Sequence, residues 1–198
     1  MTPPAPKLKR PTPWSVVEHP LLIKGHTPVA AYDYGEAGEK VRFKPKTFRW
    51  RYRVGNAWYN GKRPGTRCVP YGLARLLEHA DESVFIVEGE KDADCLNAAG
   101  LVAVSIERGH EVEAAEHLAG RVVFIIPDND EVGSNRARIV LEAVRGVAAS
   151  ARIVDLPGLN PKGDVTDWLD AGHSAAELIT LTGEVPTAEA DEAIAGFS

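Results

Sequence analysis

The sequence predicts an α/β fold, an open parallel sheet with helices on both faces, preceded by a small basic β-rich domain. Continuous apolar runs at residues 84–87 and 122–126 are typical of strands buried on both faces, as in parallel sheets covered by helices. Segments with helical character separate these runs, which is the order of βαβ units. Between residues 40 and 54, charged and apolar residues alternate instead, as in half-buried strands.

The domain organisation is predicted from changes in composition. We expect an extended basic, proline-rich arm (1–27), a small basic β-rich domain with a C-terminal helix (28–80), the α/β domain (81–182), and an acidic tail or linker (183–198). Residues 1–80 hold 15 Lys/Arg and 5 Asp/Glu, whereas residues 81–198 hold 8 and 23. This asymmetry favours one part that meets a polyanion and another with acidic chemistry. Two oppositely charged domains that attract each other would give the same composition.

The basic β-rich domain contains two alternating segments. A strand is expected over 29–34, and residues 40–54 are expected to form two strands with a bend at Thr47–Phe48. The basic residues here are a first basic set, Lys40, Arg42, Lys44 and Lys46, and a second basic set, Arg49, Arg51 and Arg53. Such side chains neutralise nucleic-acid phosphates. The aromatic residues of 48–52 either form the packed face of the sheet or stack on exposed bases.

The α/β domain shows a regular alternation of elements. Strands are expected over 84–87, 101–106, 121–126 and 152–156, and helices over 91–99, 111–118, 133–147 and 174–181. A further helix over 71–80 is expected to lead into this domain. Ligands of open parallel sheets bind at the carboxyl ends of the strands.

Three acidic residues follow two of the buried strands. Glu88 comes after the strand at 84–87, and Asp128 and Asp130 come after the strand at 121–126. In one cleft, their repulsion would oppose ionisation of all three unless a cation lies between them. Carboxylate oxygens suit Mg²⁺, with Mn²⁺ as the alternative ion. The plainer interpretation is that they are ordinary acidic residues of strand-to-helix loops.

The acidic motifs resemble those of a known family. VEGEKDA, PDNDEVG and PKGDVTDWL occur in that order within residues 82–172 and resemble the Toprim domain, in the form found in primases and primase-helicases of phages and mobile elements. The resemblance implies that Glu88, Asp128 and Asp130 are catalytic, with Glu88 as general acid/base, and that Glu88, Asp128, Asp130, Asp92 and Asp164 are metal ligands. Lys91 would contact nucleic-acid phosphate, although an exposed helical lysine is an equal alternative. Asp92 also fits an ordinary acid at a helix start, and Asp167 fits the N-cap of a helix beginning at Trp168.

The resemblance implies metal-dependent nucleotidyl transfer, with primase-like synthesis of oligoribonucleotides on single-stranded DNA as the leading hypothesis. A Toprim nuclease would use the same carboxylates with water as the nucleophile. A non-catalytic module that binds nucleic acid or a helicase is the third hypothesis. Phosphorelay receiver domains share the layout and bind Mg²⁺, but the EGEKD element and the basic domain do not fit them.

The expected partners are a single-stranded DNA template, nucleoside triphosphates and a replicative helicase. Zinc is not expected, because Cys68 and Cys95 do not form a C-x-x-C pair. No apolar run approaches the roughly 20 residues that span a bilayer. The expectation is therefore a reduced, cytoplasmic protein without membrane association.

Overall fold

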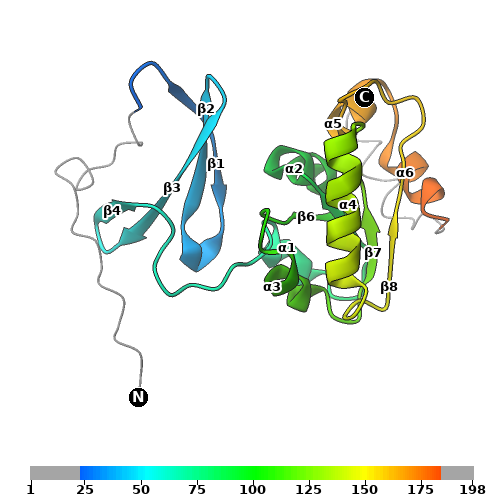
Figure 1. Ribbon diagram of the computed structural model, residues 1–198, viewed down its shortest axis with the longest axis horizontal. Helices are drawn as coiled ribbons and strands as arrows, with labels where there is room; N and C mark the ends of the chain where they lie inside the picture. The colour runs from blue at the N-terminus through cyan, green and yellow to red at the C-terminus, as the bar shows by residue number, and fades with distance from the viewer. Residues whose placement is uncertain (1–22, 184–198) are drawn as a thin grey trace. The chain divides into compact units, whose positions relative to one another are not determined.

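The computed structural model describes residues 23–183 and consists of two compact units, with the boundary between Cys68 and Val69 (Figure 1). We call residues 23–68 unit 1 and residues 69–183 unit 2. The expected arm over residues 1–27 and the expected tail over 183–198 lie almost wholly outside the described residues.

Unit 1 is a four-stranded antiparallel sheet with its strands in sequence order. The strands are β1 (Thr27–Asp33), β2 (Glu39–Lys44), β3 (Thr47–Val54) and β4 (Ala57–Asn60), with the 3₁₀ turn η1 (Gly35–Ala37) after β1. The turn between β2 and β3 lies at Pro45–Lys46, slightly before the bend expected at Thr47–Phe48. The strand β4 was not expected, because its four residues are too few to show an alternation.

The register of the β2–β3 hairpin separates the two basic sets. Lys40 pairs with Trp50 and Arg42 pairs with Phe48, whereas Arg49 pairs with Val41. Directly paired residues of antiparallel strands point to the same face of a sheet. The strand residues of the first basic set therefore share a face with the aromatic rings of β3, and the second basic set lies on the opposite face.

Unit 2 is built on a parallel sheet with the strand order β6-β5-β7-β8. The strands are β5 (Val84–Val87), β6 (Val102–Ser105), β7 (Val122–Ile125) and β8 (Ser150–Ile153). Every residue of β5 and β6 is buried, as expected for continuous apolar strands covered on both faces. The predicted fold class is therefore confirmed: an open parallel α/β sheet preceded by a small β-rich unit.

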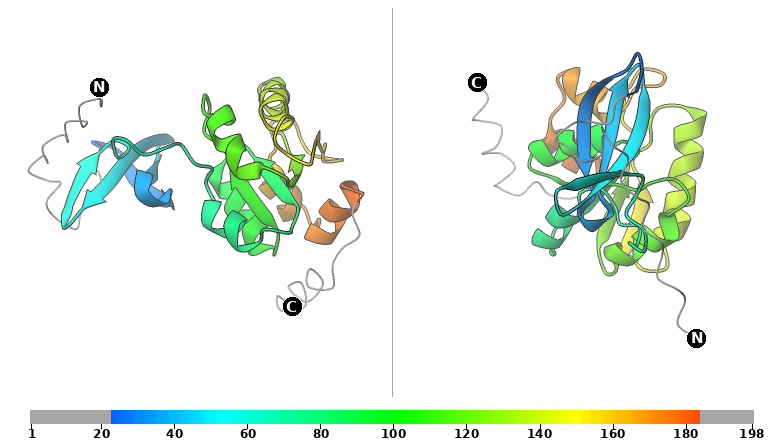
Figure 2. Two further views of the ribbon diagram at one scale, coloured as in Figure 1. Left: turned by 90° about the horizontal axis from the view of Figure 1, so that it is seen from below. Right: turned by 90° about the vertical axis from the view of Figure 1, so that its left-hand side faces the viewer.

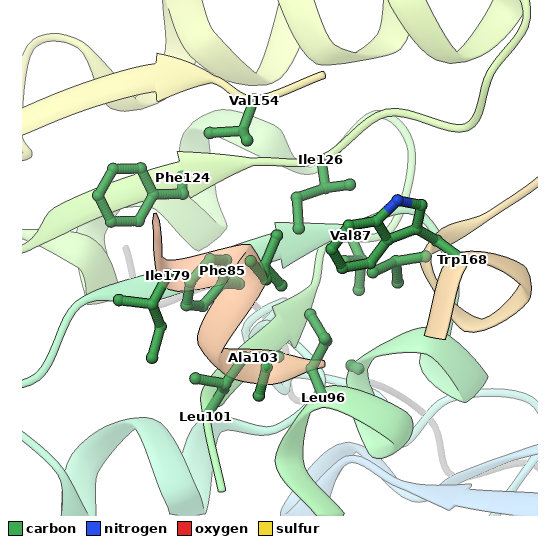
Figure 3. Close-up of a cluster of buried hydrophobic side chains, with 14 residues drawn as sticks. Phe85, Val87, Leu96, Leu101, Ala103, Phe124, Ile126, Val154, Trp168 and Ile179 are labelled. Carbon is green, nitrogen blue, oxygen red and sulfur yellow. The ribbon is translucent and has the colours of Figure 1, made fainter. Parts of the chain in front are cut away.

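Helices cover both faces of this sheet (Figure 2). They are α1 (Leu73–Glu78), α2 (Glu90–Ala98), α3 (Glu111–Ala115) with the 3₁₀ turn η2 (Glu116–Leu118), α4 (Glu131–Val144), α5 (Val165–Asp170) and α6 (Ala175–Leu181). One face packs against α2, α5 and α6, where Phe85, Phe124 and Trp168 lie in one buried cluster (Figure 3). The other face packs against α1, α3 and α4. Among the described helices, none is long and apolar enough to cross a membrane.

Helix α1 packs with unit 2, although the sequence placed it at the end of a domain spanning 28–80. Leu76 is completely buried in the cluster that contains Val84 and Val102. The backbone of Tyr71 pairs with that of Ser105, and the Arg75 guanidinium donates to the Leu101 carbonyl at 2.8 Å. The boundary expected at residues 80 and 81 is corrected to 68 and 69, because this amphipathic helix completes the core of the parallel sheet.

We expect Leu76→Ala to lower the free energy of unfolding of the protein by about 2–5 kcal/mol, because it removes a side chain with no exposure from a packed core. Chemical denaturation followed by circular dichroism measures this change. The matched control is Leu77→Ala, since Leu77 is 64 % exposed and its loss should cost less than about 0.5 kcal/mol. Equal losses in the two variants would contradict the packing of α1 described here.

Candidate active site

Glu88 directly follows the central strand β5, and its main chain is fixed by the neighbouring strand. The Ser105 hydroxyl, at the end of β6, donates to the Glu88 carbonyl at 2.9 Å. The side chain of Glu88 is 18 % exposed, and its Oε2 atom lies 3.2 Å from Nη2 of Arg108. Its Oε1 atom is buried and has no hydrogen-bond partner among the described residues. A buried carboxylate oxygen of this kind costs free energy unless a cation or donor reaches it.

Asp128 and Asp130 lie in the loop between β7 and α4, as the sequence predicted. Asp130 is the N-cap of α4, and its Oδ1 atom accepts from the amide of Gly133 at 2.7 Å. This bond satisfies one of the amides at the helix start and leaves the second carboxylate oxygen for another ligand. The loop therefore holds one acidic side chain at the helix and presents a second, Asp128, beside it.

The Asp128 carboxyl has the most perturbed acidity of the cleft. Burial, the largest cause, together with the charges of Glu88, Asp92, Asp164 and Asp130 raises the pKa of Asp128 to about 7. Without a cation, the cluster thus keeps a proton on Asp128 near neutral pH. A metal ion would supply the missing positive charge and would displace that proton.

A glycine lets the start of α4 approach β5 closely. A Cβ atom on Gly133 would lie 2.3 Å from the Asp128 carbonyl oxygen and 2.9 Å from Oε1 of Glu88. Real Cβ atoms do not approach backbone this closely, so a larger residue would push the helix away from the loop. The absence of a side chain at position 133 is what allows Glu88 and Asp128 to lie together.

A second acidic group surrounds Lys91 at the start of α2. The Lys91 ammonium lies 2.8 Å from Oδ2 of Asp164 and 3.4 Å from Oδ1 of Asp92. The Thr166 hydroxyl donates to Asp92 at 2.6 Å. Burial raises the pKa of Asp92. Burial acts on Asp164 in the same direction, but the hydrogen bonds from Lys91 and from the Asp167 amide outweigh it, so the pKa of Asp164 is lowered. Both carboxylates lie close enough to Asp128 to raise its pKa, but the Lys91 ammonium already neutralises part of their charge.

Helix α5 begins at Val165, three residues before the start expected from the sequence. Asp164 is its N-cap, and its Oδ1 atom accepts from the Asp167 amide at 2.9 Å. Asp167 completes a capping box, because its Oδ2 atom accepts from the Asp164 amide at 3.0 Å. The expectation that Asp167 is the N-cap is therefore wrong. With two aspartates three residues apart, either helix start would place an acid at the cap.

Asn129, between the two aspartates, joins the loop after β7 to the loop before α5. Its amide donates to the Gly163 carbonyl at 2.9 Å, and its carbonyl accepts from the Lys162 amide at 2.8 Å. Its side chain donates to the Leu159 carbonyl at 2.7 Å. Asp128 and Asp164 come from these two loops, so Asn129 fixes their relative position.

The donor set of the cleft fits a hard divalent cation. It consists of carboxylate oxygens, it has a buried unpartnered oxygen on Glu88, and Asp128 retains a proton near pH 7. Within the described residues, the oxygens of Glu88, Asp128 and Asp130 are not all within 4.8 Å of one another. Their side chains would therefore have to turn toward the ion when it binds.

The predicted site residues divide between the two units. The acidic residues and Lys91 come together in unit 2, whereas both basic sets are in unit 1. Sequence reasoning missed Arg108, Asn129, Thr166 and Ser105 as parts of the cleft. The position of Asn129 inside D-N-D offered a signal, but a basic residue in the loop after a strand, such as Arg108, is too common to stand out.

No protein-family model matches the chain, and a search of curated proteins gives no match. Two solved structures are similar to it. One is the DnaG primase catalytic domain bound to single-stranded DNA, with 21% identity over 74% of this chain and 53% of that chain, and a TM-score of 0.48. The other is a DNA primase domain from Pseudomonas aeruginosa, with 22% identity over 77% of this chain and 53% of that chain, and a TM-score of 0.49. The chain thus spans about half the length of each.

We expect Asp128→Asn to stabilise the metal-free protein above neutral pH. The folded-state pKa of Asp128 is raised from 3.8 to about 7, so folding favours the protonated form, and the wild type loses stability as the pH rises through this window. At pH 8 in EDTA the variant should melt roughly 2–4 °C higher than the wild type. Near pH 5 the difference should be less than half as large, because most of the window between 3.8 and about 7 lies above that pH. Calorimetry at the two pH values measures this.

The control for this experiment is Asp155→Asn, an exposed acid that follows the edge strand β8. It should leave the pH dependence of the wild type unchanged. A melting temperature of Asp128→Asn that stays below that of the wild type at pH 8 would contradict the buried, repelled state of Asp128.

We expect Gly133→Ala to weaken binding of Mn²⁺ about tenfold or more, because the new methyl group collides with the Asp128 backbone and separates Asp128 from Glu88. Isothermal titration calorimetry measures the affinity. Gly146→Ala is the control, since a Cβ atom there meets nothing within 4 Å. Wild-type affinity in Gly133→Ala would show that the close approach is not required.

Proposed function

We propose that the chain is a Toprim-type, metal-dependent nucleotidyltransferase that synthesises oligoribonucleotides on single-stranded DNA, as a primase of phage or mobile-element replication does. The observation that carries the proposal is the carboxylate cleft at the ends of β5 and β7. In it, the buried Oε1 of Glu88 has no partner among the described residues, and Asp128 has its pKa raised to about 7. Such a cleft is suited to divalent ions, Mg²⁺ or Mn²⁺, and to phosphoryl transfer.

Each acidic side chain has a proposed role. A bound divalent cation would stabilise the charge that develops on the attacking 3′-oxygen and on the oxygen of the departing pyrophosphate. Asp128 and the second oxygen of Asp130 would hold it, together with Glu88. Glu88 would also accept the proton of the attacking 3′-hydroxyl, since one of its carboxylate oxygens has no hydrogen-bond partner among the described residues. Asp92 and Asp164 would complete the acidic wall and orient Lys91.

The nucleic-acid strand would be held by basic residues. Lys91 in unit 2 lies at the cleft, and the exposed members of the basic sets in unit 1 are Lys44, Lys46, Arg49 and Arg53. Arg51 is less available, because it pairs with Glu39 at 2.6 Å and lies over the Trp58 ring. Single-stranded DNA and nucleoside triphosphates are the proposed ligands, with a replicative helicase as a further partner. Phosphate contacts of this kind weaken steeply with salt.

We expect the wild-type protein to join labelled ribonucleotides into oligonucleotides on a single-stranded DNA template in Mg²⁺ or Mn²⁺. The rate of this synthesis should fall at least about 100-fold in Glu88→Gln and in Asp128→Asn. Both substitutions keep the size of the side chain and remove its charge. Gel analysis of labelled products measures the rate. Glu142→Gln, an exposed acid on α4, is the control and should retain full activity.

The same incubation separates the alternative functions. Loss of the DNA without synthesis, abolished in Glu88→Gln, would assign a nuclease that uses water as the nucleophile of the same cleft. A wild-type protein that binds DNA with the same affinity in the presence and absence of EDTA, and that neither makes nor degrades nucleic acid, would overturn the proposed catalysis. It would then be assigned as a binding module.

A further inference from the structure

Arg108 lies in a short loop whose two ends are held by another arginine. The loop runs from the end of β6 to the start of α3. The buried guanidinium of Arg136, on α4, donates to the Ile106 carbonyl at 2.8 Å and forms an ion pair with Glu111. Both flanks of Arg108 are therefore fixed to α4, and the tip of the loop stays beside the carboxyl end of β5.

The side chain of Arg108 differs from that of Arg136 in its surroundings. It is 64 % exposed, whereas the Arg136 side chain is 8 % exposed. The Arg108 guanidinium contacts Oε2 of Glu88 at 3.2 Å. Ion pairs with one largely exposed partner are weak and are readily exchanged. The loop is thus fixed while the charged end of Arg108 is able to move.

Arg108 contacts the carboxylate that the proposed metal ion requires. A cation that takes Glu88 as a ligand competes with the guanidinium for the negative charge of Glu88. Lys91 is in a different position, because its ammonium is held between Asp92 and Asp164. Of these two basic residues at the cleft, Arg108 is therefore the one whose partner would be taken over by the ion.

We propose that Arg108 is a phosphate-binding residue of the cleft, held by Glu88 until a divalent cation takes that carboxylate and then free to bind a phosphate group of the nucleotide. The planar guanidinium can donate two parallel hydrogen bonds to phosphate oxygens. A carboxylate that is bound to a metal ion is a weaker acceptor for the same hydrogen bonds. With Nη2 3.2 Å from Oε2 of Glu88, the guanidinium already lies beside a carboxylate that would hold the ion. This inference rests on the function proposed above.

The first test measures Mn²⁺ binding by isothermal titration calorimetry in the absence of nucleotide. Arg108→Gln removes the competing charge and keeps a hydrogen-bonding side chain, so it should bind Mn²⁺ about threefold more tightly than the wild type. The second test titrates ATP into protein saturated with Mn²⁺. There Arg108→Gln should bind about tenfold more weakly, because the phosphate contact is lost.

The matched control is Arg138→Gln, an exposed arginine on α4 whose guanidinium donates to Asn135 at 2.9 Å. It should change neither affinity, and thermal melting should show that both variants are folded. In Arg108→Gln the affinity for Mn²⁺ should rise and the affinity for ATP should fall. A purely structural role of Arg108 would instead lower both affinities together.

The outcomes separate this inference from the function on which it rests. Wild-type protein that binds Mn²⁺, together with an Arg108→Gln variant that keeps the wild-type affinity for ATP, would overturn the inference and leave the metal site standing. Wild-type protein that binds no Mn²⁺ would overturn the proposed function and the inference with it.

Discussion

Repulsion among five carboxylates is the constraint on which the cleft depends. Glu88, Asp92, Asp130 and Asp164 all lie close enough to Asp128 for their charges to raise its pKa, in addition to the larger effect of burial, so Asp128 keeps a proton near neutral pH. The fold offsets part of this repulsion with its own donors. Lys91 lies between two of the acids, Arg108 contacts a third, and the first turns of α4 and α5 supply backbone amides. The buried Oε1 of Glu88 has no such donor among the described residues, so a cation that reaches it gains most.

The acidic residues lie together because their main-chain segments pack closely. The parallel sheet brings the ends of β5 and β7 side by side, and Gly133 then allows α4 to begin almost in contact with the loop that carries Asp128. Asn129 extends the same rigidity to the loop before α5 through backbone hydrogen bonds. Because these contacts involve backbone atoms, they fix the main chain that carries Asp128, Asp130 and Asp164, while the carboxylates themselves can still turn.

The parts that the sequence predicted well are those determined locally. Buried parallel strands require continuous apolar runs, so β5 and β7 and the acids after them were visible in the sequence. The membership of α1 in unit 2 was not visible, because it depends on Leu76 meeting strands from later in the chain. The cap of α5 was misassigned since both Asp164 and Asp167 satisfy the local rule. Arg108 was missed because its partner, Glu88, is 20 residues away in the sequence.

In the hairpin of unit 1, the alternation of basic and apolar residues was predicted correctly, but the face on which each basic set lies depends on how the strands pair. Each basic set alternates with apolar residues as expected, but the register that pairs Lys40 with Trp50 puts the two sets on opposite faces. A single flat strand of nucleic acid cannot lie against both faces at once. The proposed contact must therefore involve one set, or pass around the edge of the hairpin at Lys44 and Lys46. Each set has two exposed members, but in the second set Arg49 donates to the Phe48 carbonyl and Arg53 to the Gly55 carbonyl, which favours the end of the hairpin at Lys44 and Lys46.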